Sequence, residues 1–257
     1  MDPAVMHAAV EIAREAGELT LEHFRSGDLS VDSKADGTPV TVADQAAERL
    51  IRERLGARFP DDTVLGEEEP DQHGTSARRW IIDPIDGTKA FTHGVPLYTN
   101  LLALEDEHGS AVGVINVPAL GETVWAGRGL GCFCNGEPAR VSSTTEPSGA
   151  WATTSGFDSW SPELFARLKH SGMHLRTWGD GYGYVLVATG RIDAMIDPAA
   201  ALWDVAPMPV IMSEAGGRFS ATTGDPSPDA GSGLGTNGVL HDHLLDLFAE
   251  RPSSDDV

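Results

Sequence analysis

Residues 80–88 read Trp80-Ile81-Ile82-Asp83-Pro84-Ile85-Asp86-Gly87-Thr88. The apolar start predicts a buried strand, and the proline and Gly-Thr predict a sharp turn into the beginning of a helix. Two closely spaced carboxylates offer the hard oxygen ligands that Mg²⁺ and similar cations prefer. Backbone amides at a helix start suit a phosphate group. The stretch therefore indicates a metal ion beside a phosphate, the arrangement used in phosphoryl chemistry.

The composition is that of a globular, acidic protein. The chain has 257 residues, 40% of them hydrophobic, and a net charge of −21 from 39 acidic and 18 basic residues. Such a surface repels nucleic acids and anionic membranes, so neither is expected as a partner. No apolar run reaches the roughly 18 residues of a transmembrane helix. The first residues show no apolar signal-peptide region, so a signal peptide is not expected, and Cys132 and Cys134 are expected to be reduced thiols. We expect a cytoplasmic enzyme.

Helix and strand patterns form two groups along the chain. Apolar spacing predicts helices over residues 4–25 and from a capping box at Thr41–Asp44 to Pro60. Strands and then alternating strands and helices follow, so the class is mixed α/β. The polar stretch 144–149 is the best boundary. It divides an N-terminal α+β half, residues 1–145, from a C-terminal α/β half, residues 146–257, within one compact unit.

Several local elements are expected within these halves. The strands of the N-terminal half include Tyr98–Leu104, Ala111–Val117, Glu122–Ala126 and Ala139–Ser142. Residues 33–39 and 224–235 are expected to be loops. A helix is expected after Trp203, and Pro207 and Pro209 should make it start late or kink.

Two further acidic motifs follow apolar runs. Glu67-Glu68-Glu69 comes after a short strand, and Asp204 lies in Trp203-Asp204-Val205-Ala206. Alone, an acidic triplet is usually a solvated loop. Together with Asp83 and Asp86, these motifs can converge on one metal cluster, because close carboxylates need a cation to offset their repulsion.

The three acidic motifs resemble those of the inositol monophosphatase family. Further matches are Gly129-x-Gly131, Asn135-Gly136 and Val187-Ala188-Thr189-Gly190 before Asp193, so the resemblance spans nearly the whole chain. It implies a layered αβαβα sandwich of the inositol monophosphatase and fructose-bisphosphatase type. It also implies a homodimer that hydrolyses a small phosphate ester with two or three Mg²⁺ ions, for which Mn²⁺ can substitute.

The resemblance assigns roles position by position. The metal ligands implied are Glu67, Asp83, the backbone carbonyl of Ile85, Asp86 and Asp204. Gly87 and Thr88 match the phosphate-binding positions, and Asp44 matches an outer aspartate near a more weakly held ion. Glu67 and Thr88 also match the residues that orient and activate the attacking water.

Substrate choice is expected to depend on the stretch Arg176–Tyr184. With Phe91-x-x-Gly94-Val95-Pro96, it looks most like the histidinol-phosphate phosphatase branch of the family. The substrate-facing candidates are Arg176, Asp180 and Asp197, of which the two acids suit a cationic leaving group. Alternatively, Asp180 caps a helix. Gly181 stands where a larger residue is expected, which leaves a roomier pocket and a related amino-alcohol phosphate open.

Other functions fit less well. Myo-inositol monophosphate is the closest rival substrate, whereas fructose bisphosphate or a nucleotide 3′-phosphate needs a second anion site, and no Lys/Arg cluster supplies one. An inactive homologue that serves as a regulatory subunit is disfavoured, because every matched acidic position is present. His241 and His243 are expected to lie at the surface rather than to form a zinc site at His241-Asp242-His243.

Overall fold

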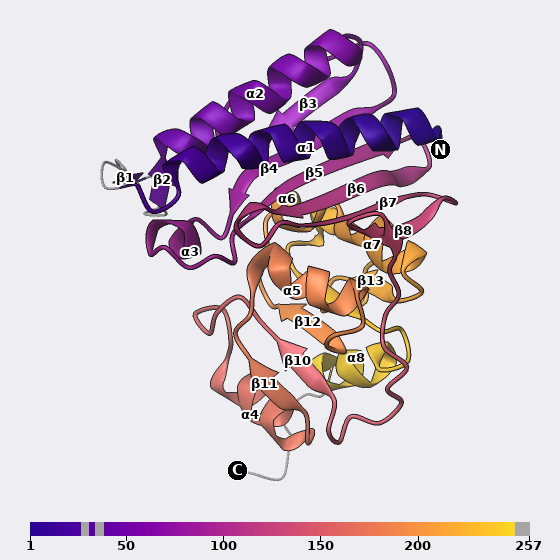
Figure 1. The fold of residues 1–257 in the computed structure, drawn as a ribbon. Coiled ribbons are helices and arrows are strands. Elements are labelled where there is room, and N and C mark those ends of the chain that lie inside the picture. Colours follow the sequence, from indigo (N-terminus) through magenta and orange to yellow (C-terminus); the bar gives the residue numbers. More distant parts are fainter. Residues whose placement is uncertain (27–30, 34–38, 250–257) are drawn as a thin grey trace.

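The structure is a computed structural model that describes residues 1–26, 31–33 and 39–249. Helices and sheets alternate in five layers, with helices outside both sheets and between them (Figure 1). The predicted αβαβα architecture is confirmed. Most of the loop expected at 33–39 lies outside the described residues.

The element bounds are as follows. The helices are α1 (Pro3–His23), α2 (Val42–Arg58), α3 (Thr88–Thr92), α4 (Pro162–His170), α5 (Asp180–Ala188), α6 (Leu202–Val205), α7 (Met208–Glu214) and α8 (His241–Ala249). The first sheet has the order β3 (Thr63–Gly66), β4 (Arg79–Asp86), β5 (Thr99–Asp106), β6 (Gly109–Val117), β7 (Glu122–Gly127), β8 (Gly131–Cys134), β9 (Glu137–Pro138). The second has the order β11 (His174–Arg176), β10 (Trp151–Thr153), β12 (Ala194–Asp197), β14 (Gly233–Thr236), β13 (Arg218–Ser220), and β1 (Val31–Ser33) pairs with β2 (Pro39–Thr41).

The helical layer outside the first sheet consists of α1 and α2. Asp2 accepts a hydrogen bond from the N–H of Ala4, and α2 begins with the predicted capping box between Thr41 and Asp44. Such caps satisfy the first free N–H groups of a helix. The apolar stripes of both helices pack on one face of the first sheet, around residues such as Trp80 and Leu102.

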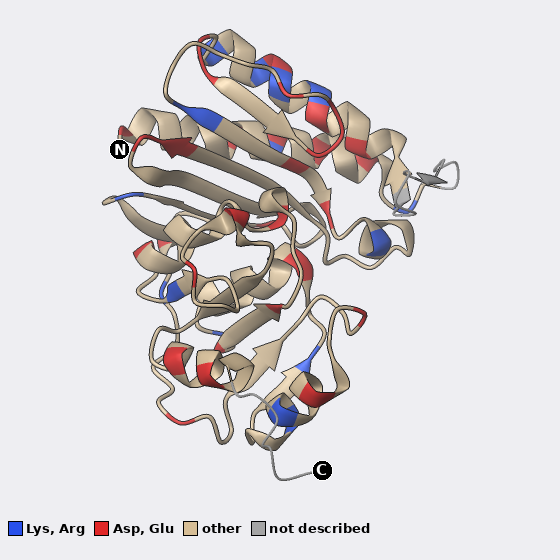
Figure 2. Cartoon of the chain, turned by 180° about the vertical axis from the view of Figure 1, so that it is seen from behind, with Lys and Arg blue, Asp and Glu red and all other residues tan. Residues whose placement is uncertain are grey.

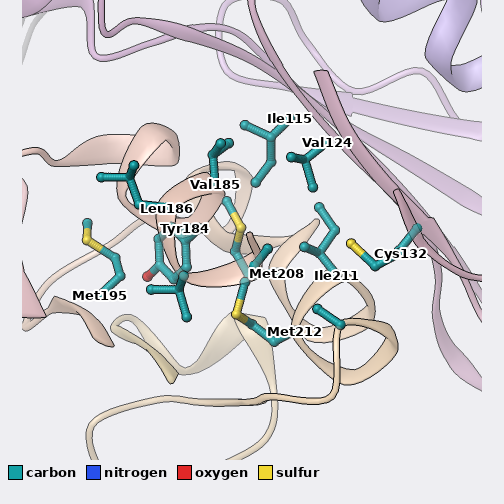
Figure 3. Packing of buried hydrophobic residues seen from close by; sticks show 14 of the residues in the cluster. Ile115, Val124, Cys132, Tyr184, Val185, Leu186, Met195, Met208, Ile211 and Met212 are labelled. Atoms are coloured by element: carbon teal, nitrogen blue, oxygen red, sulfur yellow. The ribbon is translucent and has the colours of Figure 1, made fainter. Parts of the chain in front are cut away.

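The middle layer joins the two sheets. Because side chains alternate along a strand, Leu101 points away from α1 and α2 and faces α5 and α7. Ile115 and Val124 from the first sheet pack against Tyr184 and Met208 from these helices (Figure 3). One buried cluster therefore connects the two halves of the chain.

Two expected elements were wrong. The strand expected at 139–142 does not form: the first sheet ends with β8 and β9, which precede these residues. Residues 233–235, the end of the surface loop expected at 224–235, instead belong to the buried strand β14 between β12 and β13. A Cβ built on Gly235 would lie 2.8 Å from the ring of Tyr184, so glycine here admits the tyrosine ring rather than marking a turn.

Acidic residues lie in both halves of the chain, and α2 carries both acidic and basic residues (Figure 2). Within the described ranges, no helix combines the length and apolar character that crossing a membrane requires.

Candidate active site

A bulge in β4 brings two carboxylates to the same face of the first sheet. Asp83 pairs with Leu101 and Asp86 with Thr99, so three steps along β4 match two along β5. Without the extra residue, two positions an odd number of residues apart would face opposite sides. The side-chain amide of Asn100 donates to the carbonyl of Pro84 at 2.6 Å inside the bulge. The predicted turn at Pro84 was therefore wrong: the strand continues to Asp86.

The second half of the chain adds a third carboxylate. Asp204 lies in the first turn of α6, where its Oδ2 accepts the N–H of Ala201 at 2.8 Å. The helix predicted after Trp203 is interrupted near Pro207, as expected, and forms two short helices, α6 and α7. Asp204 nevertheless meets the bulge, and one oxygen each of Asp83, Asp86 and Asp204 lie within 4.8 Å of one another.

Burial and mutual repulsion act on this cluster. Desolvation raises the pKa of Asp83 well above its ordinary value, and the charges of Glu67, Asp86 and Asp204 raise it further. Desolvation likewise raises the pKa of Asp86, with Asp180 the next cause. Charged acids in such a place need a cation, and an all-oxygen donor set suits a hard divalent one.

Asp44 gives a second indication of a cation. Its side chain is 1% exposed, and its Oδ2 accepts the N–H of Thr41 at 2.8 Å. Its Oδ1 is buried and has no hydrogen-bond partner among the described residues. Burial raises the pKa of Asp44, and nearby Glu67 contributes to the rise. A buried acceptor without a donor is costly in a protein interior, so the residues present fit a positively charged group here.

The turn after β4 forms the floor of the site. Gly87 has a φ of 80°, a left-handed conformation that favours glycine, and α3 starts at the next residue. The hydroxyl of Thr88 donates to the carbonyl of Ile85 at 3.0 Å. The predicted start of a helix at Gly-Thr is confirmed.

A cleft of about 740 Å³ is lined by the carboxylates of Asp83, Asp86 and Asp204 and by the Gly87-Thr88 turn, but not by Asp44. Its walls include most of the expected site residues together with Lys89, Ser155, Asp158 and Trp203, for which no role was expected from the sequence. Lys89 extends the Gly-Thr motif by one residue and Trp203 directly precedes Asp204 in its motif, whereas the sequence offers no signal for Ser155 and Asp158. Its Nζ lies 4.0 Å from the carboxylate of Asp158.

Ser155 connects the two acids expected to face the substrate. Its hydroxyl accepts the N–H of Asp180 at 2.9 Å and donates to Asp197 at 2.7 Å. Asp180 does not cap α5, because the capping position is Gly179. Its φ of 55° is unusual for a residue other than glycine, and burial raises its pKa. The network fixes Asp180 at the wall of the cleft.

Asp197 is more enclosed than Asp180. It is 7% exposed, and the hydroxyl of Tyr184 donates to its second oxygen at 3.4 Å. Burial raises the pKa of Asp197 to about 7, although the hydrogen bonds from Ser155 lower it. Since both oxygens already have partners, Asp197 acts on the cleft mainly through Ser155.

Gly181 does not enlarge the cleft. Its N–H donates to Asp86, and a Cβ there would lie 2.4 Å from the hydroxyl oxygen of Thr99 and 2.8 Å from Asp86. Glycine is needed because the backbone approaches a buried carboxylate. The expectation of a roomier pocket at this position was wrong.

Two other candidates lie away from the cleft. The guanidinium of Arg176 lies over the rings of Trp151 and Trp178, 4.9 Å and 5.8 Å from their centroids. His241, expected at the surface, is fully buried between the hydroxyls of Ser220 and Thr236. Burial lowers the pKa of His241 to about 4. The neutral ring therefore serves packing and hydrogen bonding.

Comparison with known proteins agrees with this geometry. The sequence profile of the inositol monophosphatase family matches residues 2–253. The chain is 43% identical to the histidinol-phosphatase of Chlorobaculum parvum, over 90% of this chain and 94% of that protein. It is 41% identical to the histidinol-phosphatase of Mycobacterium tuberculosis, over 92% and 95%. The IMPase structure of Thermotoga maritima superposes with a TM-score of 0.87 at 30% identity, covering 97% of both chains. The chain therefore belongs to the inositol monophosphatase family of metal-dependent phosphatases.

Proposed function

We propose that this protein is a histidinol-phosphatase, which hydrolyses histidinol phosphate to histidinol and phosphate. The observation that carries the chemistry is the meeting of Asp83, Asp86 and Asp204 within 4.8 Å beside the Gly87-Thr88 turn. The observation that favours the substrate is similarity: relatives named histidinol-phosphatase are 38–43% identical to this chain, against 28–35% for relatives named inositol monophosphatase.

The proposed metal is Mg²⁺, in two or three ions, with Mn²⁺ as a substitute. The residues that would hold it are Glu67, Asp83, the carbonyl of Ile85, Asp86 and Asp204, with Asp44 near a weaker position. When bound, such ions lower the pKa of water and stabilise the leaving oxygen of an in-line displacement. The carbonyl of Ile85 also accepts the hydroxyl of Thr88, and one oxygen each of Asp83, Asp86 and Asp204 accepts at least one backbone N–H, so these bonds help to orient the proposed ligands.

The other residues bind and orient the phosphate ester. Gly87 and Thr88 would receive the phosphate at the start of α3, where backbone N–H groups are free of helix partners. Glu67 and Thr88 would hold the attacking water, the carboxylate by accepting its proton and the hydroxyl by fixing its position. Lys89 is the positive charge at the rim of an otherwise acidic cleft, where it favours approach of the phosphate.

The organic half of the substrate would lie along Asp180. Histidinol carries an ammonium group and an imidazole, and a carboxylate within about 4–6 Å favours the charged form of either. Asp197 would act indirectly, by holding Ser155 against the N–H of Asp180. Arg176 is omitted from the proposal, because its guanidinium lies on Trp151 and Trp178 instead.

The oligomeric state and the location of the enzyme are also proposed. We propose a homodimer in the cytoplasm that serves histidine biosynthesis. We also propose that residues 1–145 and 146–257 are two halves of one folding unit, an idea supported by the buried cluster that includes Ile115 and Met208. The presence of all matched carboxylates argues against an inactive regulatory homologue.

Phosphate release from histidinol phosphate and from myo-inositol 1-phosphate, measured side by side with Mg²⁺, tests the proposed substrate. We expect a clearly higher kcat/KM for histidinol phosphate. Equal values, or a preference for the inositol ester, would contradict the assignment. No release from any ester, despite stoichiometric metal binding, would favour the inactive homologue.

Asp180→Asn should weaken binding of the cationic substrate selectively. Asparagine keeps the size of the side chain and removes its charge, and a hydrogen bond to a charged group contributes about 1.5–3 kcal/mol. We therefore expect KM for histidinol phosphate to rise roughly tenfold or more. The control is an ester whose organic half is uncharged when bound, such as p-nitrophenyl phosphate, whose KM should stay nearly unchanged. An equal rise for both esters would indicate general damage to the site.

A further inference from the structure

Glu67 is a half-buried residue that lies just after the edge strand of the first sheet. It follows Gly66, the last residue of β3, and β3 is the edge strand of the first sheet. The chain then runs through an irregular connection, residues 67–78, before β4 begins. The connection pairs with β3 at the bridge between Val64 and Gln72, but this bridge does not hold the peptide groups that directly follow Glu67.

The side chain of Glu48 from α2 reaches this backbone. It is fully buried, and its Oε2 accepts the N–H of Glu68 at 2.8 Å. Its Oε1 accepts the N–H of Glu69 at 3.1 Å. Bonds from a charged carboxylate to backbone N–H groups are stronger than those between neutral groups. Glu48 therefore holds the two peptide groups that directly follow Glu67.

Arg52, one helical turn later in α2, binds both Glu48 and the same stretch of backbone. Its Nε donates to Glu48 at 2.8 Å, and the arginine side chain is only 9% exposed. Its two terminal nitrogens donate to the carbonyls of Val64, at 3.4 Å, and of Glu69, at 3.0 Å. The planar guanidinium fixes several acceptors at once. The pair thus binds the chain on both sides of Glu67.

Gly66 permits this contact. A Cβ built on Gly66 would lie 2.1 Å from Oε1 of Glu48 and 2.8 Å from a terminal nitrogen of Arg52. Any other residue here would push the buried pair away from the backbone. Glycine at position 66 is therefore needed for Glu48 and Arg52 to approach the backbone this closely.

The same face of α2 also carries Asp44. Residues four apart lie above one another on a helix, so Asp44, Glu48 and Arg52 form one row. Asp44 ends the row with its unpartnered oxygen, while Glu48 holds the segment of Glu67. The rigid helix therefore sets the position of Glu67 relative to Asp44.

We propose that the buried Glu48–Arg52 pair is a positioning device that holds the Glu67 carboxylate in place for the metal. The inference depends on the proposed role of Glu67 as a ligand. Glu48 does not touch the metal or the substrate in this proposal. Its loss should weaken metal binding because the backbone around Glu67 gains freedom that binding must then remove.

The test is the dissociation constant of Mn²⁺, measured by calorimetric titration of the metal-free full-length protein without substrate. Glu48→Gln keeps the volume of the side chain but turns one accepting oxygen into a donor that faces a backbone N–H. We expect the dissociation constant to rise roughly 10–100-fold, the usual loss when a group that orients a ligand is changed. Arg52→Lys, which keeps the charge but not the fork, should raise it less, and it carries the test if Glu48→Gln does not fold.

Asp62→Asn is the matched control. Asp62 is a buried carboxylate directly before β3, and it holds the far end of the same connection by accepting from Ser76 and Arg78, as well as from Trp80 in β4. Both variants should lower Tm, but only the Glu48 variant should weaken Mn²⁺ binding. An unchanged dissociation constant in Glu48→Gln, or an equal loss in Asp62→Asn, would overturn the proposal.

Glu67→Gln separates this inference from the proposed function. If it weakens Mn²⁺ binding while Glu48→Gln does not, the ligand assignment survives and the positioning role is refuted. If Glu67→Gln itself leaves Mn²⁺ binding unchanged, the ligand assignment fails and the positioning role fails with it.

Discussion

Asp86→Asn is expected to reduce kcat for phosphate release on the order of a thousandfold or more, with Mg²⁺ present. The hydroxyl of Thr99 and the N–H of Gly181 both donate to one oxygen of Asp86. The amide keeps a carbonyl oxygen for one set of contacts but removes the charge that a divalent ion would need. Loss of several kcal/mol of electrostatic stabilisation corresponds to a change of this size. Steady-state phosphate release at saturating substrate measures it.

Asp193→Asn provides the matched control for that loss. Asp193 is equally enclosed but lies away from the cleft, where it accepts from the hydroxyl of Ser142 and the N–H of Trp151. Its substitution should lower Tm with only a small change in kcat. If Asp86→Asn retained more than about a tenth of the wild-type kcat, the carboxylate cluster would not be the reacting centre.

Asp197→Asn is expected to stabilise the metal-free protein at pH 8 by roughly 4 kcal/mol, and to leave its stability at pH 4 nearly unchanged. Burial raises the pKa of Asp197 from its ordinary value of 3.8 to about 7. Asparagine keeps an oxygen for the two bonds from Ser155 and offers an amide to the hydroxyl of Tyr184. The variant therefore removes a buried charge and keeps its partners.

The sign follows from proton binding. Between about pH 4 and pH 7 the folded protein keeps a proton on Asp197 that the unfolded chain has released. The stability contributed by that proton is complete below the unfolded pKa and is lost as the pH rises through the folded pKa. Asp83 and Asp86, whose pKa values are also raised by burial, make the metal-free protein less stable with rising pH in the same direction.

Urea unfolding of both proteins in EDTA, from pH 4 to pH 8, measures this effect. The difference in free energy of unfolding should open above pH 4 and reach its full value near pH 8. A constant difference across the range would show that Asp197 keeps an ordinary pKa. A less stable variant at pH 8 would show that the charge is compensated in the folded protein.

The sequence predicted which acidic residues form the centre, but not how the fold brings them together. Residue types and spacing indicated Asp83, Asp86 and Asp204, because hard oxygen ligands at the ends of apolar runs are a local signal. The bulge that turns Asp83 and Asp86 to the same face depends on pairing with β5 and was not visible. Only the tertiary structure shows that three steps on one strand oppose two on the next.

Glycines were the main source of error. Gly235 was interpreted as part of a loop and Gly181 as empty space, since glycine is common in turns and small side chains leave room. Both instead admit a close neighbour, the ring of Tyr184 in one case and Asp86 in the other. Propensity cannot distinguish these uses, because the neighbour lies far away in the sequence.

Polar networks were similarly hidden. Ser155 carried no motif, yet it connects Asp180 with Asp197. His241 was expected at the surface because it stands at the start of the last helix, far in sequence from the acidic motifs, although its ring is enclosed by Ser220 and Thr236. Such contacts depend on which strands and helices meet, which a local pattern does not encode.

The most direct test is phosphate release from histidinol phosphate by protein stripped of metal with EDTA, before and after Mg²⁺ is added back. The buried carboxylates Asp83, Asp86 and Asp204 predict no release without metal and full recovery with Mg²⁺. Release that persisted in excess EDTA would contradict a metal-dependent centre at these residues.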